Sequence, residues 1–201
     1  MKFKLVNSEA EKEINPGEQE ISRRRLIKIG LVAAAASIVP YNSFAAAKEL
    51  LNDERRICIY NLHTKEQVDT VFWKDGSYIP EALKELNHIF RDHYNGSERL
   101  IKRDLFNLLY AIQRKLQCNE PFQLISGYRS RSTNEMLRQR NKGVSRRSLH
   151  MRGMAADIRL PGDKLKTLRK VAFELQKGGV GYYPRSNFVH LDVGNVRFWR
   201  G

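Results

Sequence analysis

The chain has 201 residues, which is enough for one domain with its own hydrophobic core and too few for two large domains. Its formal net charge of +14 favours a polyanionic partner, such as nucleic acid, an anionic membrane surface or an acidic polymer, although a solvated basic surface without a partner stays open. Cys58 and Cys118 are not spaced as a metal knuckle or a CxxC redox pair, and their separation leaves a disulfide open.

An export signal is predicted over residues 1–45. The stretch "SRRRLIK" (22–28) resembles the twin-arginine pattern, which is read by a translocase for folded proteins, and it precedes an apolar run over residues 29–39. Since this run is far shorter than the ~20 apolar residues that span a bilayer, we expect cleavage near residues 45–47, with an uncleaved anchor as the alternative. The mature protein is therefore expected in the periplasm, without a stable membrane span.

The mature chain, residues 46–201, keeps the basic character of the whole. Removal of residues 1–45 leaves 29 basic and 17 acidic residues. Outside the cytoplasm we expect no nucleic acid partner, and the abundant polyanions there are cell-wall polymers and outer lipids. No internal repeat or coiled-coil pattern divides this stretch, so a single domain is expected.

The mature chain is expected to begin with a β-hairpin. Two β-rich runs, over residues 57–62 and 68–73, flank the polar stretch "HTKEQ". Two amphipathic helices are expected next, within residues 79–94 and 101–117. The second has apolar residues that share one face: Leu105, Leu108, Leu109, Ile112 and Leu116.

Short strands and two further helices are expected after residue 120. A strand starts the stretch "PFQLISGYRS", and a short helix with Ser132 as its N-cap ends at Gly143. A loop then leads to a strand over residues 155–160, and an amphipathic helix within residues 163–179 stops at two glycines. Short strands close the chain, over residues 180–184, 188–194 and 196–199. This order indicates an α+β fold with a mostly antiparallel sheet flanked by helices.

His150, Asp157 and His190 are the side chains with the clearest chemical meaning. Two imidazoles and one carboxylate form a set that holds zinc and leaves a fourth position for water. Because strand residues alternate between faces, His190 and Asp192 share one face of "FVHLDV", and Asp157 lies on the face of "AADIRL" opposite its apolar neighbours. The pattern predicts a site between two strands within residues 125–194, with a structural His–Asp pair as the alternative.

A known motif runs through the same residues. The stretch "SLHMRGMAAD" matches SxHxxGxAxD at Ser148, His150, Gly153, Ala155 and Asp157. Together with "SGYRS" upstream and "GGVGYYPRSNFVHLDVG" downstream, it resembles the zinc peptidases of the D-alanyl-D-alanine carboxypeptidase and VanX type, a group that includes the hedgehog-like proteins. Within this group the mature chain is most similar to the murein endopeptidases. The resemblance implies a hedgehog/D,D-peptidase-like zinc peptidase fold.

The resemblance also implies roles for individual residues. Zn²⁺ would be bound by His150, Asp157 and His190. Arg129 of "SGYRS" would stabilise the oxyanion, a role suited to a fixed positive charge. Ser148 is expected to touch substrate or to support a ligand, and Tyr183 to line a substrate groove or to pack at the edge of the core.

The general base departs from the family pattern. VanX-type enzymes carry a glutamate three residues before the last zinc ligand, and Asn187 stands at that position here, where it accepts no proton. Asp192 is the candidate base, because it shares a strand face with His190; it could equally orient that ligand. The other histidines, His63, His88 and His93, are expected to be surface or structural residues.

The sequence thus predicts a periplasmic zinc metallopeptidase that hydrolyses cross-links between peptidoglycan stem peptides. The expected bond is the L,D cross-link between two diaminopimelate residues. The first alternative is a D,D-carboxypeptidase or D,D-endopeptidase that acts on D-alanyl bonds, a choice that depends on the shape of the pocket. The second alternative is a non-catalytic, zinc-containing cell-wall-binding module, against which the intact ligand set and Arg129 argue.

Overall fold

The computed structural model describes residues 54–201. The predicted signal over residues 1–45, its cleavage site and the start of the mature domain lie outside the described residues. Within residues 54–201, no helix combines the length and the apolar character needed to cross a membrane.

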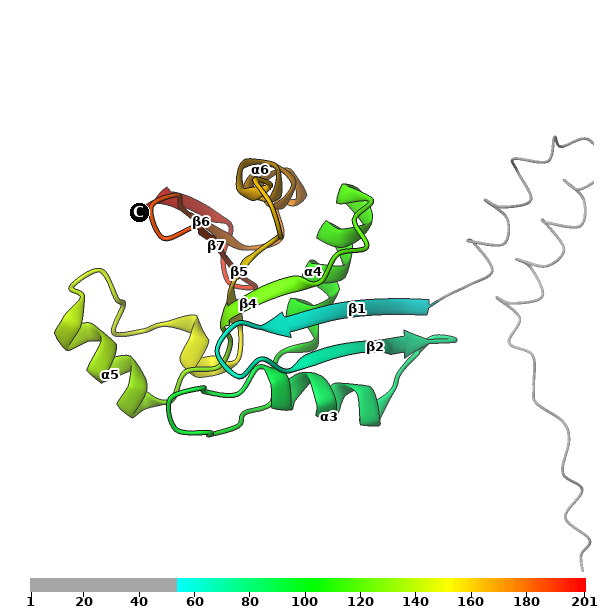
Figure 1. Cartoon of the computed structure of the whole chain (residues 1–201), viewed down its shortest axis with the longest axis horizontal. Coiled ribbons are helices and arrows are strands. Elements are labelled where there is room, and N and C mark those ends of the chain that lie inside the picture. The colour runs from blue at the N-terminus through cyan, green and yellow to red at the C-terminus, as the bar shows by residue number, and fades with distance from the viewer. Residues whose placement is uncertain (1–53) are drawn as a thin grey trace, which may run out of the picture. The chain divides into compact units, whose positions relative to one another are not determined.

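One eight-stranded sheet forms the framework of these residues (Figure 1). In chain order the strands are β1 (Glu54–Asn61), β2 (Gln67–Lys74), β3 (Ser77–Tyr78), β4 (Phe122–Ser126), β5 (Ala155–Arg159), β6 (Gly179–Tyr183), β7 (Phe188–Asp192) and β8 (Arg197–Arg200). Across the sheet they follow the order β3-β2-β1-β4-β5-β7-β6-β8. The expected hairpin is confirmed as β1 and β2, and β3 extends it.

The expectation of a mostly antiparallel sheet is wrong, because the sheet is mixed. β4 lies parallel to β1, since two helices carry the chain back before it enters the sheet. β8 lies parallel to β6, because the chain reverses twice around β7 before β8 joins the outer edge of β6. Side-chain periodicity identifies a strand but not the neighbour beside which it inserts, so these two pairings were invisible in the sequence.

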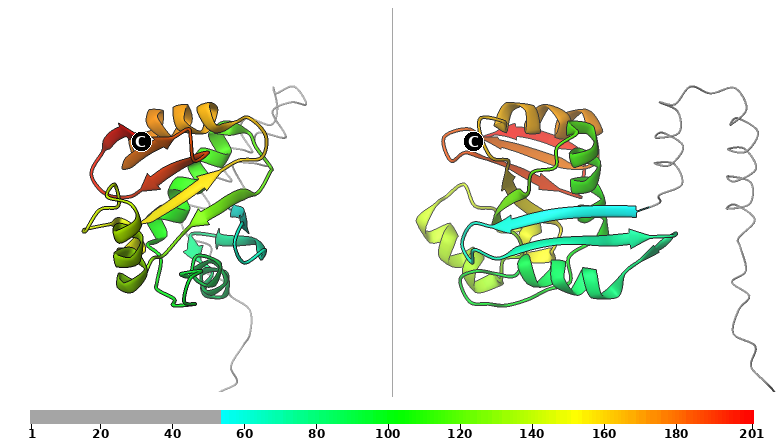
Figure 2. Two further views of the ribbon diagram at one scale, coloured as in Figure 1. Left: turned by 60° about the vertical axis from the view of Figure 1, so that its left-hand side comes forward. Right: turned by 45° about the vertical axis from the view of Figure 1, so that its right-hand side comes forward.

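Within the part of the chain that the structure describes, four α-helices and one 3-10 helix join the strands. They are α3 (Pro80–Ile89), α4 (Arg103–Leu116), α5 (Arg131–Arg140), the 3-10 helix η1 (Leu149–Arg152) and α6 (Leu165–Leu175). α3, α4 and α6 share one hydrophobic core with the strands. The views of Figure 2 show α6 at one side of the sheet and α3 beside the β1–β2 hairpin, while α5 lies at one end of the molecule.

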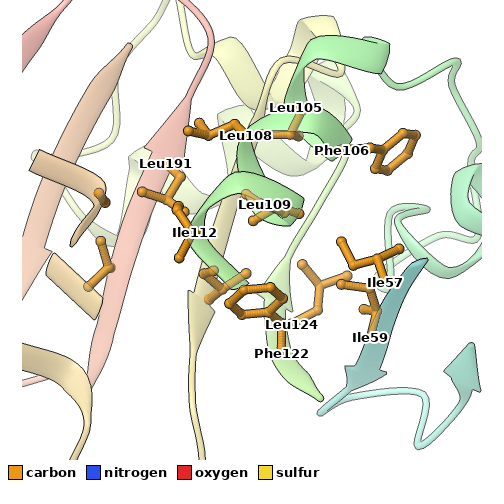
Figure 3. Packing of buried hydrophobic residues seen from close by; sticks show 14 of the residues in the cluster. Ile57, Ile59, Leu105, Phe106, Leu108, Leu109, Ile112, Phe122, Leu124 and Leu191 are labelled. Carbon is orange, nitrogen blue, oxygen red and sulfur yellow. The ribbon is translucent and has the colours of Figure 1, made fainter. Parts of the chain in front are cut away.

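α4 has the apolar face that the sequence predicts. Leu105, Leu109 and Ile112 are fully buried and lie over β4, where Phe122 and Leu124 meet them (Figure 3). Leu108 is also buried, whereas Leu116 at the end of the helix is only partly so. Burial of each side chain of this size stabilises the fold by about 1.5–3 kcal/mol relative to exposure. The packing of α4 therefore stabilises one side of the sheet.

Two helix boundaries differ from the expectation. α3 ends at Ile89, before the apolar pattern does, and Asp92 then accepts hydrogen bonds from the backbone of Tyr94 and Ser130. α5 is capped by Ser130 rather than Ser132, because the Oγ of Ser130 accepts the N–H of Thr133 at 3.2 Å. The two serines are equally good caps by residue type, and the contact with Asp92 selects the first.

The two cysteines are free thiols in the structure. Cys58 lies on β1, and Cys118 follows the C-terminal end of α4. Burial raises the pKa of the Cys58 thiol, which keeps it in the unreactive protonated form. The disulfide that the sequence left open is therefore not formed here.

The central strands have one apolar and one polar face, as the alternation predicts. Ile158 of β5 and Val189 of β7 are fully buried in the core. Asp157 and His190, their chain neighbours, are paired across the two strands and lie on the opposite face. α3, α4 and α6 therefore support the sheet from one side, and the polar side chains gather on the other.

Candidate metal centre

The three predicted ligands come together on the polar face of the sheet. The Nε2 atom of His150 lies 3.3 Å from Oδ1 of Asp157 and 3.1 Å from Nδ1 of His190. Nδ1 of His190 lies 2.9 Å from the same Asp157 oxygen. Donor atoms from all three residues lie within 4.8 Å of one another, which is the spacing at which one cation can contact them all.

Strand register brings two of these ligands together, and a short helix brings the third. Asp157 and His190 face each other directly in the β5–β7 ladder. His150 lies in η1, which ends at Gly153 in the left-handed conformation with φ of 62°. A Cβ atom at Gly153 would lie 2.6 Å from the carbonyl oxygen of Leu100, so only glycine allows η1 to pack this closely. The motif glycine therefore positions His150.

Hydrogen bonds fix which nitrogen of each histidine faces the centre. Nδ1 of His150 lies 2.7 Å from the carbonyl oxygen of Gly127, an acceptor that requires the proton on Nδ1 and leaves the Nε2 lone pair for a metal. Nε2 of His190 lies 2.9 Å from Oδ2 of Asp192, which leaves Nδ1 for the metal. Partners of this kind behind metal-binding histidines set the tautomer and the ring orientation. The donor set therefore fits a divalent cation.

Burial and hydrogen bonding set the protonation of the three residues. Burial lowers the pKa of His150, which keeps it neutral, while the two histidines outweigh the effect of burial on Asp157 and hold its pKa far below the usual range. Burial also acts to lower the pKa of His190, but hydrogen bonds to Asp157 and Asp192 raise it to about 9. A proton thus occupies His190 at neutral pH, and a metal must displace it, so metal affinity falls as the pH falls.

Arg129 lies beside the centre and is hydrogen-bonded to one of its ligands. Its Nη2 atom donates to Oδ2 of Asp157 at 3.2 Å and to Oγ of Ser126 at 3.1 Å. The side chain is only 12% exposed, and it lines the cleft above the three ligands. A buried guanidinium here orients the Asp157 carboxylate and holds a fixed positive charge beside the centre.

Asp192 is enclosed on every side. The residue is fully buried, and its carboxylate accepts the N–H groups of Gly179 and Gly194. Arg197 of β8 pairs with both oxygens, at 3.0 Å and 2.6 Å, and His190 takes a further position. Burial acts to raise the pKa of Asp192, but these hydrogen bonds outweigh it and hold the pKa well below its usual range. Such a carboxylate is suited to orienting His190 rather than to accepting a proton from water.

Asp192→Asn is expected to weaken metal binding about 10- to 100-fold, because the amide loses the charge that orients the Nε2–H group of His190. Metal competition against a chromogenic chelator measures the affinity, and kcat is then compared with the metal in excess. Asp69→Asn is the matched control, since Asp69 pairs with Arg56 elsewhere on the sheet and should leave both values unchanged. Unchanged affinity with a large loss of kcat would instead make Asp192 the base.

A cleft of about 770 Å³ opens over the centre, and aromatic side chains form part of its wall. Trp199 donates from Nε1 to the hydroxyl oxygen of Tyr183 at 2.8 Å, and Tyr183 stacks on Phe188 with ring centroids 4.5 Å apart. The Trp199 ring also lies 5.2 Å from the ring of His190. A Cβ atom on Gly181 would lie 2.5 Å from this indole, so the glycine admits Trp199 to the site. Tyr183 therefore lies in the wall of this cleft.

The remaining sequence candidates are placed as follows. Ser148 is buried at the start of η1 and lines the cleft. Asn187 lies in the β6–β7 turn with φ of 53°, a left-handed conformation that asparagine tolerates better than glutamate, which gives a local reason for the departure from the VanX-type pattern. His63 and His93 stack on each other at 3.8 Å, and His88 contacts Glu98 at 2.7 Å. These three histidines take no part in the ligand set.

Sequence reasoning missed Trp199 and Arg197, which both come from β8. Each depends on β8 lying beside β6, so that Trp199 reaches His190 and Arg197 reaches Asp192. The glycine at position 181, opposite His190 in the ladder, was the available signal, because a strand glycine often marks close approach of another group.

Comparison with known proteins identifies the family of the chain. The family model described as "Peptidoglycan L,D-endopeptidase MepK" matches residues 49–199. The peptidoglycan L,D-endopeptidase MepK of Escherichia coli (strain K12) is 43% identical over 180 residues, which cover 90% of this chain and 98% of that protein. The probable peptidoglycan L,D-endopeptidase MepK of Haemophilus influenzae is 35% identical over 181 residues, covering 90% of this chain and 96% of that protein. No solved structure matches the chain significantly. The chain therefore belongs to the family of the peptidoglycan L,D-endopeptidase MepK.

Proposed function

We propose that this chain is a zinc peptidase that hydrolyses cross-links between peptidoglycan stem peptides, acting on the L,D bond between two diaminopimelate residues. Membership of the MepK family supports the reaction and the substrate. The observation that carries the metal dependence is the convergence of donor atoms from His150, Asp157 and His190, with both histidine tautomers fixed from behind. The domain is the D,D-peptidase-like zinc fold over residues 46–201.

Zinc would be held by Nε2 of His150, Nδ1 of His190 and the Asp157 carboxylate. When bound, it supplies Lewis acidity, which lowers the pKa of water to near neutrality and polarises a carbonyl. Arg129 places its charge where negative charge develops on the substrate carbonyl oxygen. Asp192 acts as a positioning residue for His190, the second of its two expected roles. Ser148 supports the neighbouring ligand from its buried position at the start of η1.

The cellular location follows from the same assignment. Peptidoglycan lies outside the cytoplasmic membrane, so an enzyme that acts on it must be exported. The twin-arginine stretch over residues 22–28 supports export by the translocase for folded proteins, with cleavage near residues 45–47. The net positive charge of the mature periplasmic protein then favours its association with an acidic polymer.

Purified residues 46–201 are expected to convert L,D-linked muropeptide dimers to monomers, with activity lost to a chelator and restored by zinc. Mass spectrometry of the products identifies both the bond and the metal requirement. Cleavage of D,D-linked dimers in place of L,D-linked dimers would move the assignment to the D-alanyl bond. Zinc-loaded protein that cleaves neither dimer would refute the peptidase and favour the cell-wall-binding module.

A further inference from the structure

The cleft over the candidate metal centre is lined by more positive charge than the pairs at the centre account for. Four arginines line it: Arg129, Arg147, Arg185 and Arg197. Among the described residues that line the cleft, Asp157 has the single side-chain carboxylate, and it belongs to the candidate ligand set. Any substrate that enters this space therefore meets an excess of guanidinium groups.

The four arginines divide into two kinds. Arg129 and Arg197 are held by carboxylates inside the fold, at 3.2 Å from Asp157 and 2.6 Å from Asp192. Arg147 and Arg185 are exposed, and no carboxylate within residues 54–201 lies at ion-pair distance from either of them. The fold therefore does not account for these two side chains, and their guanidinium groups are free to bind a ligand.

Their positions place them on the two segments that border the centre. Arg147 lies in the loop between α5 and η1, three residues before His150. Arg185 lies in the β6–β7 turn, five residues before His190. Both segments line the same cleft, and they lie at the same end of the sheet in Figure 1 and in the right-hand view of Figure 2. A peptide bound over the centre would thus extend toward both arginines.

The bond that we propose as substrate has a carboxylate on each side. On the nitrogen side, the carbon that bears the scissile nitrogen of one diaminopimelate also bears a carboxylate. On the carbonyl side, the other diaminopimelate has a carboxylate at the far end of its side chain. Arginine is the side chain best matched to a carboxylate, because its planar fork forms two parallel hydrogen bonds.

We propose that Arg147 and Arg185 bind the two carboxylates that flank the scissile amide, one on each side. This inference rests on the proposed function and adds the determinant of its specificity. A D,D cross-link shares the nitrogen-side residue, but its carbonyl-side residue is alanine, whose side chain is a methyl group. The arginine on the carbonyl side therefore favours the L,D bond, while the arginine on the nitrogen side serves both bonds equally.

The test combines enzyme variants with altered substrates. Arg147→Gln and Arg185→Gln are compared with wild type on three L,D-linked dimers. In the first dimer both carboxylates are free, in the second only the nitrogen-side carboxylate is amidated, and in the third only the carbonyl-side carboxylate is amidated. For wild type, each amidation should lower kcat/KM about tenfold, mainly through KM, as loss of a charged hydrogen bond does. On the dimer with both carboxylates free, each variant should show a kcat/KM about tenfold below that of wild type. Amidation on one side should then cause no further loss, and this side should differ between the two variants.

Arg146→Gln is the matched control, because Arg146 is exposed in the same loop and does not line the cleft. It should behave as wild type on all three dimers. Variants that match wild type on every dimer would overturn the inference. The same holds if, for each variant, amidation on either side lowers kcat/KM further. In both cases, cleavage of the dimer with free carboxylates leaves the proposed function standing. If wild type cleaves none of the dimers, the proposed function fails first.

Discussion

His150→Ala is expected to abolish metal binding and cross-link hydrolysis together. The substitution removes a nitrogen donor whose lone pair is aimed at the centre by the Gly127 carbonyl, and two remaining donors do not form a stable zinc site. The metal content of the purified protein is measured by inductively coupled plasma mass spectrometry. Hydrolysis is measured by the appearance of muropeptide monomers. Both signals should fall below detection.

His88→Ala is the control for this experiment, since His88 is an exposed histidine that contacts Glu98 and does not belong to the ligand set. Asp157→Asn is a second, nearly isosteric variant, which keeps the shape of the centre and removes its charge. Circular dichroism establishes that each variant is folded. A folded His150→Ala protein that hydrolyses dimers without bound metal would refute the metal mechanism.

Arg129→Ala is expected to lower kcat on the order of 100-fold or more while zinc stays bound. The guanidinium donates to Asp157 and lines the cleft, and in the proposed mechanism it stabilises the charge that develops on the carbonyl oxygen. Because the same side chain orients a ligand, kcat is measured with zinc in excess, so that weakened metal binding does not limit the rate.

Arg131→Ala provides the comparison for Arg129, since Arg131 is an exposed arginine at the start of α5, two residues away and outside the cleft. It should keep the wild-type kcat. If excess zinc restores the full kcat of Arg129→Ala, then the arginine acts only by holding Asp157 in place, and the oxyanion role must be given up.

That the three candidate ligands lie together could be predicted, because the pattern that indicates it is local. Asp157 and His190 lie in short strands whose apolar neighbours identify the buried face, and alternation alone places both side chains on the other face. The spacing from Ser148 to Asp157 adds a turn with an obligatory glycine. These features depend on neighbours a few positions apart, which a sequence records directly.

The features of the site that the sequence did not predict depend on which strands become neighbours in the sheet. The role of Asp192 rests on Arg197, and Arg197 reaches it because β8 joins the sheet beside β6. The sequence expectation of a mostly antiparallel sheet contained no such pairing, so it could not choose between a base and a positioning residue. The N-cap of α5 is a smaller example, since the contact with Asp92 that favours Ser130 comes from 38 residues earlier.

The direct pairing of Asp157 with His190 has a consequence for how the protein reaches its native state. A shift of one residue in either strand would turn that strand's donor toward the hydrophobic core and expose an apolar residue instead. Only the native alignment therefore brings the three candidate ligands together, and a bound cation would favour it over shifted alignments. At a free metal concentration 100 times the dissociation constant, this selection is worth about 2.7 kcal/mol. Metal binding would thus favour correct pairing of β5 with β7, because a chain with a shifted register lacks the complete site and gains no stability from the metal.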